Sequence, residues 1–451
     1  MAEGRPTSLD TDWVRAQFPA LRAAASASPQ RIFLDAPGGT QVPEGVVAAM
    51  RTYLVESNSN IDGAYEPSRR TDELIAGARR YAGAFVGGDP DGIAFGQNMT
   101  TLNFNLVRAV GRTLSPGDEI LTTALDHEGN VSPWLLMAED RGLVVREVGL
   151  TEQLDVDLED LRRKLSDRTR VVAFCLASNA VGTVTRAREI ADLAHAAGAL
   201  AWGDAVAYAP HRRVDVRSLG LDVVLCSPYK FFGPHLGMAW IRSDLAASLP
   251  AERVRPAAEV PPGHRFETGT LSHEAIAGFV AALDYLAALG SGGDLAALGS
   301  GGDRAALGSG GDLTARLRAA YDVIQRHESG LAGALGAGIA GIAGVRPVGM
   351  PADSAARVPT FGLVCERSAP RRLAEALGDA GIYVWDGNFY AKRVVETLGL
   401  DLDEGLLRIG IAHYNTQAEI DRLLDVLGRV LRAAASPDER LARPLPVTAR
   451  A

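Results

Sequence analysis

The chain has 451 residues, of which 47% are hydrophobic and 22% are charged, a balance typical of folded globular proteins. Its length exceeds one ordinary core and predicts two domains. The formal net charge of −9 argues against nucleic acid or an anionic membrane as the main partner. No apolar signal segment and no apolar run of about 18 residues occurs, so we expect no membrane span and a cytoplasmic location.

Three cysteines, Cys175, Cys226 and Cys365, lie far apart in apolar stretches. None belongs to a CxxC or CxxH pattern, so we expect no metal site, and their odd number argues against a disulfide framework. We expect them to be buried free thiols in a reducing compartment.

Helical and strand-like stretches alternate between about residue 70 and residue 290. The predicted helices cover 72–87, 102–114, 133–142, 156–166 and 188–199, and the predicted strands cover 92–97, 118–124, 143–150, 170–178, 200–206 and 222–229. This alternation predicts an α/β domain with a mostly parallel sheet and helices on both faces. Ligands of such sheets bind at the carboxyl ends of the strands. Six candidate residues each follow an apolar strand: Thr100, Thr101, His127, Asn179, Asp204 and Lys230.

The pattern changes after residue 313. A long helix at 313–339 precedes shorter strands near 358–366, 381–387 and 406–415 and a closing helix at 418–435, which predicts a smaller α+β domain. We therefore expect an N-terminal segment that packs with the small domain, a large domain, an insertion, the small domain and a tail. Their ranges are 1–30, 31–290, 286–313, 314–435 and 436–451.

The insertion repeats a nine-residue unit three times over residues 286–312, beginning with LAALGSGGD. Calcium-binding β-helix repeats also have nine residues with glycines and an aspartate. However, three units make a very short solenoid, and LAAL favours a helix. We expect a flexible surface insertion rather than a calcium site.

Lys230 lies between aromatic residues in the stretch CSPYKFFGPHLG, at a predicted buried corner. Lysine is seldom buried without a partner, because removing an ammonium group from water is costly. The amine of Lys230 either reaches solvent from a loop or is bonded covalently to a carbonyl as a Schiff base.

Residues that precede Lys230 could complete a cofactor site. Asp204 could cap a turn, or it could keep a pyridine nitrogen protonated, which lets pyridoxal phosphate (PLP) act as an electron sink. His127 could stack on that ring or be a polar turn residue, and Asn179 could bind its phenolic oxygen or stabilise a turn. The stretch GQNMTTLNF, at a helix start, could bind a phosphate group or serve only as a cap.

A series of motifs runs in order between about residues 12 and 432: FLDAPGGTQVP, NSNIDGAY, FGQNMTTLNF, DHEGNVSPW, ASNAVGT, DAVAYAPH, CSPYKFFGPHLG, FETGTLSHEAIAG, WDGNFYA and LRIGIAHYNT. This series resembles the class V aminotransferase branch of the fold type I PLP enzymes, and within it the cysteine-desulfurase-like subfamily. The resemblance implies PLP as the cofactor. It also implies a large domain with a mostly parallel seven-stranded sheet.

By this resemblance, Lys230 is the Schiff-base lysine, Asp204 holds the pyridine nitrogen, His127 stacks on the ring and Asn179 meets the phenolic oxygen. The lysine would also be the general base for the substrate's α-proton. Because the pKa of an unperturbed lysine is near ~10.4, burial must lower it for that role.

The resemblance also implies a phosphate site, a dimer and a substrate site. The phosphate ligands would be Thr100, Thr101, Ser227 and Tyr229, with Thr270 reaching the phosphate of the partner subunit in a homodimer. Arg408 would clamp the carboxylate of an amino-acid substrate, a role that suits its planar guanidinium group. Further residues would shape the pocket: Asn58, Asn60, Asp62, Tyr65, Trp385, Asn388, Phe389 and Tyr390.

Three departures from the family pattern bear on the reaction. Desulfurases carry a cysteine in a Gly-His-His-Cys-Ala type loop, whereas the matching loop here, at 387–391, has Tyr390 in that place. Relatives place glutamine or histidine three residues after the aspartate, where this chain has Ala207. Tyr229 stands where many relatives have histidine.

A tyrosine cannot form a persulfide, so the leading prediction is a carbon–sulfur lyase. It would cleave L-cysteine or an S-conjugated cysteine by β-elimination to a thiol, pyruvate and ammonia, as relatives do in pathways to sulfur-containing natural products. The alternatives are decarboxylation or oxidative deamination, to which Ala207 lends weight, cysteine desulfuration, epimerisation and transamination. A binding protein that keeps only the fold is the alternative outside enzymes.

Overall fold

The computed structural model describes residues 8–255, 257–293 and 310–433. Most of the predicted insertion at 286–313 and all of the predicted tail at 436–451 lie outside these residues. Their predicted character therefore stays a prediction, as do the domain boundaries.

The larger sheet has seven strands in the spatial order β2-β8-β7-β6-β5-β3-β4. Their bounds are β2 (Ile93–Gly96), β3 (Glu119–Thr123), β4 (Val144–Val148), β5 (Thr169–Cys175), β6 (Leu200–Asp204), β7 (Val223–Cys226) and β8 (Gly237–Ile241). Neighbouring strands from β4 to β7 are parallel, and β8 is antiparallel to both β7 and β2. The predicted mostly parallel seven-stranded sheet is confirmed, although β8 is not among the strands expected from the sequence pattern.

Except on the largely exposed edge strand β4, alternate residues of the strands face two different cores, as a strand buried on both faces requires. On β5, Val172 and Phe174 belong to one core, and Val171 and Ala173 belong to the other. This arrangement explains the continuous apolar run that predicted the strand.

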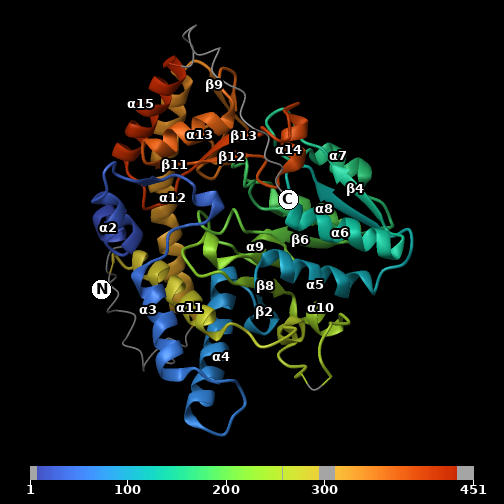
Figure 1. The fold of residues 1–451 in the computed structure, drawn as a ribbon. Coiled ribbons are helices and arrows are strands. Elements are labelled where there is room, and N and C mark those ends of the chain that lie inside the picture. Colours follow the sequence, from blue (N-terminus) through green and yellow to red (C-terminus); the bar gives the residue numbers. More distant parts are fainter. Residues whose placement is uncertain (1–7, 256, 294–309, 434–451) are drawn as a thin grey trace.

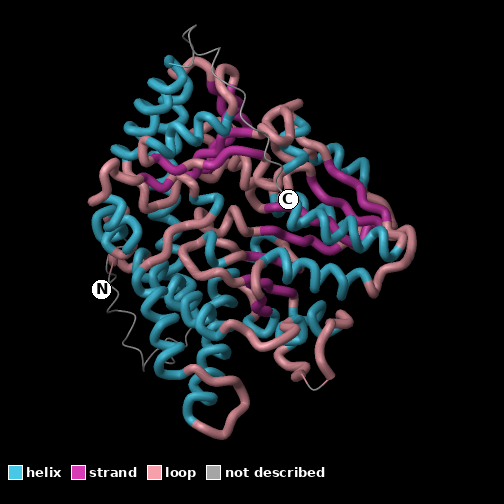
Figure 2. The backbone as a smooth tube through the Cα atoms, in the orientation of Figure 1, coloured by secondary structure: helices cyan, strands magenta, loops and turns pink. Residues whose placement is uncertain are grey.

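Helices cover both faces of the sheet (Figures 1 and 2). One face packs on α5 (Met99–Gly111), α6 (Glu128–Arg141) and α10 (Ser243–Ser248). The other packs on α4 (Glu66–Val86), α7 (Leu158–Lys164), α8 (Ala187–Ala196), α9 (Val216–Leu219), α11 (His273–Leu289) and α12 (Gly310–Ala340), and α3 (Glu44–Thr52) packs on α11. Within the described ranges, no helix is both long and apolar enough to cross a membrane.

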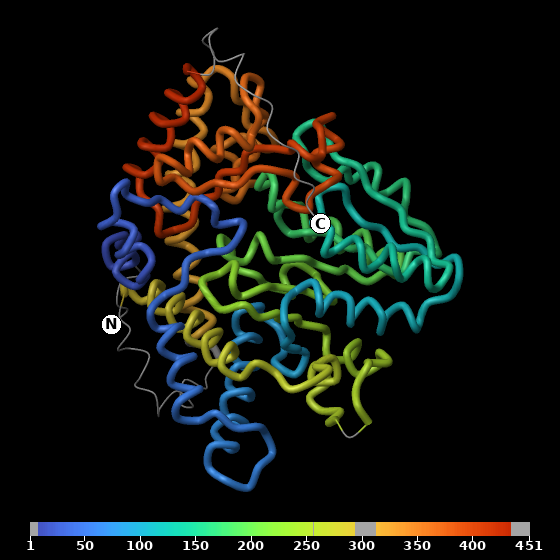
Figure 3. The backbone as a smooth tube through the Cα atoms, in the orientation of Figure 1, coloured from blue at the N-terminus to red at the C-terminus, as the bar shows by residue number. Residues whose placement is uncertain are grey.

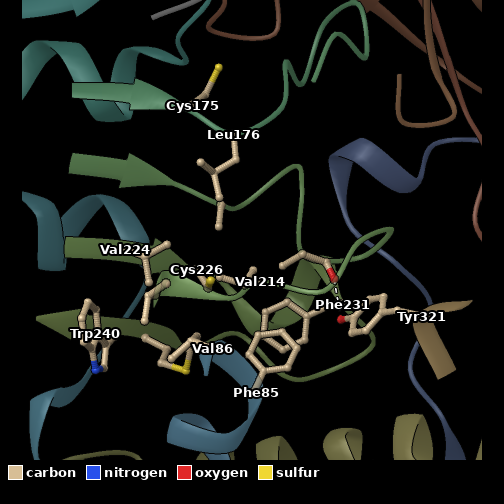
Figure 4. Close-up of a cluster of buried hydrophobic side chains, with 14 of the residues drawn as sticks. Phe85, Val86, Cys175, Leu176, Val214, Val224, Cys226, Phe231, Trp240 and Tyr321 are labelled. Carbon is tan, nitrogen blue, oxygen red and sulfur yellow. Dashed lines mark hydrogen bonds between the residues drawn. The ribbon is translucent and has the colours of Figure 1, made fainter. Parts of the chain in front are cut away.

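A cluster of buried hydrophobic side chains that includes Phe85, Phe231 and Tyr321 lies in the larger core (Figure 4). Phe231, the residue after Lys230, is fully buried and stacks on Phe85 of α4 with ring centroids 4.8 Å apart. Tyr321 of α12 donates a hydrogen bond of 2.6 Å to the carbonyl oxygen of Ala209. The stacking of Phe231 on Phe85 holds the turn that carries Lys230 against α4.

The C-terminal part of the chain forms a second, smaller sheet in the order β12-β13-β10-β9. Its elements are β9 (Val345–Val348), β10 (Thr360–Cys365), α13 (Pro370–Asp379), β12 (Trp385–Gly387), α14 (Lys392–Thr397), β13 (Leu406–Gly410) and α15 (Gln417–Ala433). All paired strands of this sheet are antiparallel. One face packs on α12, α13 and α15, so the other face is left toward the larger sheet.

The N-terminal segment lies beside the C-terminal elements (Figure 3). It contains α1 (Thr11–Ala16), α2 (Pro19–Ala25) and β1 (Ile32–Phe33), which pairs in parallel with β11 (Ile382–Tyr383). The guanidinium group of Arg15 donates to the carbonyl oxygen of Tyr414 at 2.8 Å and pairs with Glu419 at 2.9 Å. These contacts tie the N-terminal segment to the C-terminal part of the chain.

Candidate active site

A cavity of about 480 Å³ lies where the carboxyl ends of the large-sheet strands face the second sheet. Because β2, β3, β5, β6 and β7 all run in one direction, the segments that follow them meet at this edge. The predicted site residues that line the cavity are Thr100, His127, Asn179, Asp204, Ser227, Tyr229, Lys230, Trp385, Phe389, Tyr390 and Arg408.

Lys230 ends the short 3-10 turn that follows β7. Its Nζ donates a hydrogen bond of 2.5 Å to the carbonyl oxygen of Pro37 and lies 4.9 Å from the centroid of the Tyr229 ring. Burial, together with repulsion from Arg408, lowers the pKa of Lys230 to about 7. About half of the amine is therefore neutral at pH 7 and available as a nucleophile or base.

Lys230 is one of three lysines in the chain. The other two lie outside the cavity and pair with carboxylates on their own helices, Lys164 with Asp160 at 2.6 Å and Lys392 with Glu396 at 3.7 Å. Lys230 is thus the lysine that a ligand in this cavity would meet.

Asp204 is the last residue of β6 and is 4% exposed. One of its carboxylate oxygens accepts a hydrogen bond of 2.8 Å from the amide of Val206. Burial raises the pKa of Asp204 to about 6, against the opposing effects of that amide and of Lys230. A buried carboxylate of this kind favours a cationic partner within the cavity.

His127 is the N-cap residue of α6, and its Nδ1 accepts a hydrogen bond of 2.9 Å from the amide of Gly129. Burial, with repulsion from Lys230 and Arg408, lowers the pKa of His127 to about 4. The ring is therefore neutral at neutral pH, with its proton on Nε2. Its centroid lies 5.4 Å from that of the Tyr390 ring.

The first residues of α5 form a candidate anion-binding end of the cavity. Asn98, the N-cap residue, accepts a hydrogen bond of 2.8 Å from the amide of Thr101, and the Oγ of Ser227 accepts one of 3.1 Å from the amide of Met99. Thr100 and Ser227 both line the cavity there. Backbone amides, hydroxyl groups and the positive end of a helix dipole together suit a phosphate group.

Arg408 projects from β13 and is held by Asn179 and Phe389. Its guanidinium group donates to the carbonyl oxygen of Asn179 at 3.1 Å, and its central carbon lies 4.1 Å from the centroid of the Phe389 ring. The side-chain amide of Asn179 donates to the carbonyl oxygen of Phe389 at 2.8 Å, which closes a triangle of contacts. Burial lowers the pKa of Arg408 to about 9, so it remains cationic at neutral pH.

Phe389 and Tyr390, two successive non-glycine residues, have left-handed backbones with φ of 56° and 57°. Such conformations cost energy and cluster at functional sites. The amide of Tyr390 donates to Oδ1 of Asn388 at 3.0 Å, and its carbonyl oxygen accepts from the amide of Glu128 at 2.8 Å. The loop at 387–391 is thus held at Tyr390 by hydrogen bonds through both its amide and its carbonyl oxygen.

The remaining predicted site residues do not line this cavity. Thr101 bonds to Asn98, and Thr101 and the exposed Thr270 both line a neighbouring cavity of about 360 Å³ that shares His235 with the first. Asn388 donates to the carbonyl oxygen of Leu402. The loop residues Asn58, Asn60, Asp62 and Tyr65 lie between α3 and α4, away from the cavity within one chain.

Other lining residues have no role predicted from the sequence, among them Pro37, Cys175, His211 and Thr360. The contact of Pro37 uses a backbone carbonyl, which leaves no signal in residue type. Burial and the nearby Asp126 and Asp204 hold the pKa of Cys175 well above its usual range, so its thiol is protonated. His211 bonds through Nδ1 to Oε2 of Glu328 at 3.0 Å, in a buried pair between the larger sheet and α12.

A family model described as "Aminotransferase class-V" matches residues 32–295 and 306–423. The chain belongs to the class-V aminotransferase family. Its relatives include the "Aminotransferase-like protein FGM3" of Gibberella zeae, 31% identical over 94% of this chain and 99% of that one. Another relative is the "Probable cysteine desulfurase 2" of Mycobacterium leprae, 30% identical over 95% and 97%.

Solved structures agree with the class-V aminotransferase fold. The apo cysteine desulfurase from Thermococcus onnurineus NA1 matches with a TM-score of 0.81 at 22% identity, covering 96% of this chain and 100% of that one. The cysteine desulfurase CsdA from Escherichia coli matches with a TM-score of 0.78 at 22% identity, covering 95% and 100%. The predicted family and fold are both confirmed.

Enzymes of this family depend on PLP. Membership of the family therefore confirms the predicted cofactor. The side chains that line the cavity of this member of the class-V aminotransferase family fit PLP. A buried carboxylate, Asp204, suits a protonated pyridine nitrogen, and the N-terminus of α5 with Ser227 suits a phosphate. Lys230, whose pKa is near 7, has the neutral amine that an aldehyde requires.

Proposed function

We propose that this enzyme cleaves the C–S bond of L-cysteine or an S-conjugated cysteine by β-elimination. The Cα–H and Cβ–S bonds break, the sulfur leaves with the bonding electron pair and takes up a proton, and water replaces the amino group. One amino acid and one water thus give one thiol, one pyruvate and one ammonia, with no external oxidant or reductant.

The observation that carries this proposal is the environment of the loop at 387–391. Tyr390, which cannot accept sulfur as a persulfide, lines the cavity that Lys230 and Asp204 also line. The one cysteine that lines the same cavity, among the described residues, is Cys175. Because its thiol is buried and its pKa is strongly raised, Cys175 lacks the thiolate that sulfur transfer needs.

The side chains divide the remaining tasks. Bound PLP supplies the electron sink that weakens the bonds at the substrate's α-carbon. Arg408 holds the substrate carboxylate, and its contacts with Asn179 and Phe389 fix the direction of the guanidinium group. Lys230 removes the α-proton, since its pKa near 7 leaves a useful fraction of neutral amine at neutral pH.

Asp204 and His127 prepare the site for those steps. The buried carboxylate of Asp204 stabilises positive charge on a ring nitrogen, which strengthens electron withdrawal. His127 presents a neutral ring whose orientation is fixed by the amide of Gly129. Selection of one bond among those at the α-carbon then depends on how Arg408 and Lys230 orient the substrate.

We also infer that the enzyme is a cytoplasmic homodimer. Thr270 is exposed beside a cavity that adjoins the anion-binding end of the site, a position from which it could serve a second copy of the chain. Relatives in this family are typically dimeric. Three free cysteines agree with a reducing compartment.

Product analysis tests the proposed reaction. The PLP-loaded enzyme is incubated with L-cysteine, S-methyl-L-cysteine and S-benzyl-L-cysteine, and thiol, pyruvate and ammonia are assayed. We expect these products in equal amounts from at least one S-substituted cysteine. Carbon dioxide or peroxide would indicate decarboxylation or oxidative deamination, and a protein-bound persulfide would indicate desulfuration; either result would replace the proposal.

A further inference from the structure

Two large aromatic side chains are exposed at the candidate active site. Trp385 is 50% exposed and Tyr390 is 70% exposed, and both line the 480 Å³ cavity. Other exposed large apolar side chains of the described residues, such as Leu136 and Val254, lie outside it. Aromatic rings gathered at the wall of a site mark it as a binding surface for an apolar group.

Strand register fixes Trp385. It lies directly opposite Arg408 on the antiparallel strands β12 and β13, so both side chains project from the same face of the small sheet. Its indole packs over Gly38, where an added β-carbon would lie 2.7 Å from Nε1 of Trp385. Glycine at position 38 therefore leaves the space that the indole occupies.

Backbone contacts fix Tyr390 on the same cavity. Its left-handed conformation is held by Asn388 on one side and by the amide of Glu128 on the other. Its ring is tilted by 49° to the ring of His127. A rigid aromatic side chain with little conformational freedom loses little entropy when a ligand packs against it.

These positions surround the substrate's side chain. A ligand whose carboxylate is held by Arg408 places its remaining atoms beside Trp385, the cross-strand neighbour of Arg408, and within the cavity that Tyr390 lines. L-cysteine alone would leave these two rings uncovered.

We propose that Trp385 and Tyr390 are specificity-determining residues that bind an aromatic substituent on the sulfur of the substrate. The substrate class would then be S-conjugates of cysteine with an uncharged aromatic arm. This inference rests on the proposed function, because it assumes that the amino-acid end is bound at Arg408 and Lys230.

Equilibrium binding measurements test the recognition of the aromatic substituent separately from the C–S cleavage. Calorimetry with the PLP-loaded enzyme compares L-norvaline with L-2-amino-5-phenylpentanoic acid, which replace the sulfur of S-methyl- and S-benzyl-L-cysteine by a methylene group. Neither ligand has a β leaving group. We expect the phenyl compound to bind about tenfold more tightly or better, the scale of one well-placed aromatic contact.

Trp385→Ala and Tyr390→Ala should each remove most of the preference for the phenyl compound over norvaline, while Trp385→Phe keeps most of it. Leu136→Ala, which removes an exposed apolar side chain outside the cavity, is the matched control and should not change this preference. Equal binding of the two ligands to the unmodified enzyme, or an unchanged preference in both alanine variants, would overturn the inference.

Product assays separate this inference from the reaction. If the phenyl compound binds preferentially but S-benzyl-L-cysteine releases no thiol, the proposed reaction is wrong, and the inferred binding of an aromatic substituent is upheld. If thiol is released from S-methyl- and S-benzyl-L-cysteine with equal kcat/KM, the reaction stands and the inference fails. If neither amino acid binds to the PLP-loaded enzyme, both are overturned.

Discussion

Trp385 and Arg408 lie opposite each other on β12 and β13, and their side chains share the face of the small sheet that meets the cavity. The neighbours of Arg408 on its strand, Leu407 and Ile409, point the other way into the small core. One strand therefore anchors the sheet and presents Arg408, the proposed carboxylate clamp. The position of the clamp is set by strand pairing, which is more rigid than a loop.

Arg408→Lys keeps the positive charge at the clamp but removes the planar fork that can hold a carboxylate through two N–H groups. We expect KM for α-amino acids to rise about tenfold or more, with a smaller change in kcat, in initial-rate measurements. The control is Arg371→Lys on α13, whose exposed guanidinium group pairs with Glu375 outside the cavity. An unaltered KM in Arg408→Lys would show that Arg408 does not bind the substrate carboxylate.

Covalent attachment of PLP to the apo protein should depend on pH through Lys230. Because the pKa of Lys230 is lowered to about 7, its amine is neutral above that pH and protonated, hence unreactive, below it. We expect the attachment rate, followed by stopped-flow absorbance, to rise with pH around a midpoint near 7 instead of near ~10.4.

The rate of PLP attachment to Arg408→Gln, measured against pH, tests whether Arg408 contributes to the lowered pKa of Lys230. Repulsion from Arg408 lowers the pKa of Lys230, so removing the charge should move the midpoint to higher pH. A midpoint that moves lower would show that the guanidinium group does not act on the lysine in this way.

Asp204→Asn retains a side-chain oxygen that can accept the amide of Val206 but loses the negative charge. Without that charge a bound pyridine nitrogen is less readily protonated, and we expect kcat to fall by at least about 100-fold, with weaker cofactor binding. Asp192→Asn on α8, where the carboxylate pairs with Arg188 at the surface, serves as the matched control. Turnover of Asp204→Asn close to that of the control would contradict the assigned role.

Phe231→Ala should destabilise the fold and loosen the turn that bears the lysine. The ring is fully buried and stacked on Phe85, so its loss leaves a cavity that costs about 3–5 kcal/mol. The urea midpoint of the apo protein should fall clearly, whereas Val254→Ala, at an exposed position, should leave it nearly unchanged. Equal midpoints for the two variants would show that this aromatic core contributes little to stability.

Much of the fold follows from local pattern. Most of the strands β2 to β7 are apolar runs bounded by turn residues, and the edge where their carboxyl ends meet could be inferred from the sequence alone. By contrast, β8 is short and follows directly on the glycine- and aromatic-rich turn after Lys230, so its pairing with β2 and β7 depends on tertiary contact.

Parts of the site were beyond sequence reasoning for a related reason. The hydrogen bond from Lys230 to Pro37 uses a main-chain oxygen, and the pairing of Trp385 with Arg408 is a matter of strand register. Neither leaves a signal in residue type or spacing. Residues expected from family resemblance, such as Asn58 and Thr270, lie away from the cavity of one chain, and their roles stay predictions.

Reductive trapping tests the central claim most directly. The PLP-loaded enzyme is treated with borohydride and digested, and its peptides are analysed by mass spectrometry. The chain has only three lysines, so Lys164 and Lys392 act as internal controls. If Lys230 binds PLP covalently, we expect a cofactor-derived mass on the peptide that contains Lys230 and none on the peptides that contain Lys164 or Lys392. Label on Lys164 or Lys392, or no label on Lys230, would contradict this assignment.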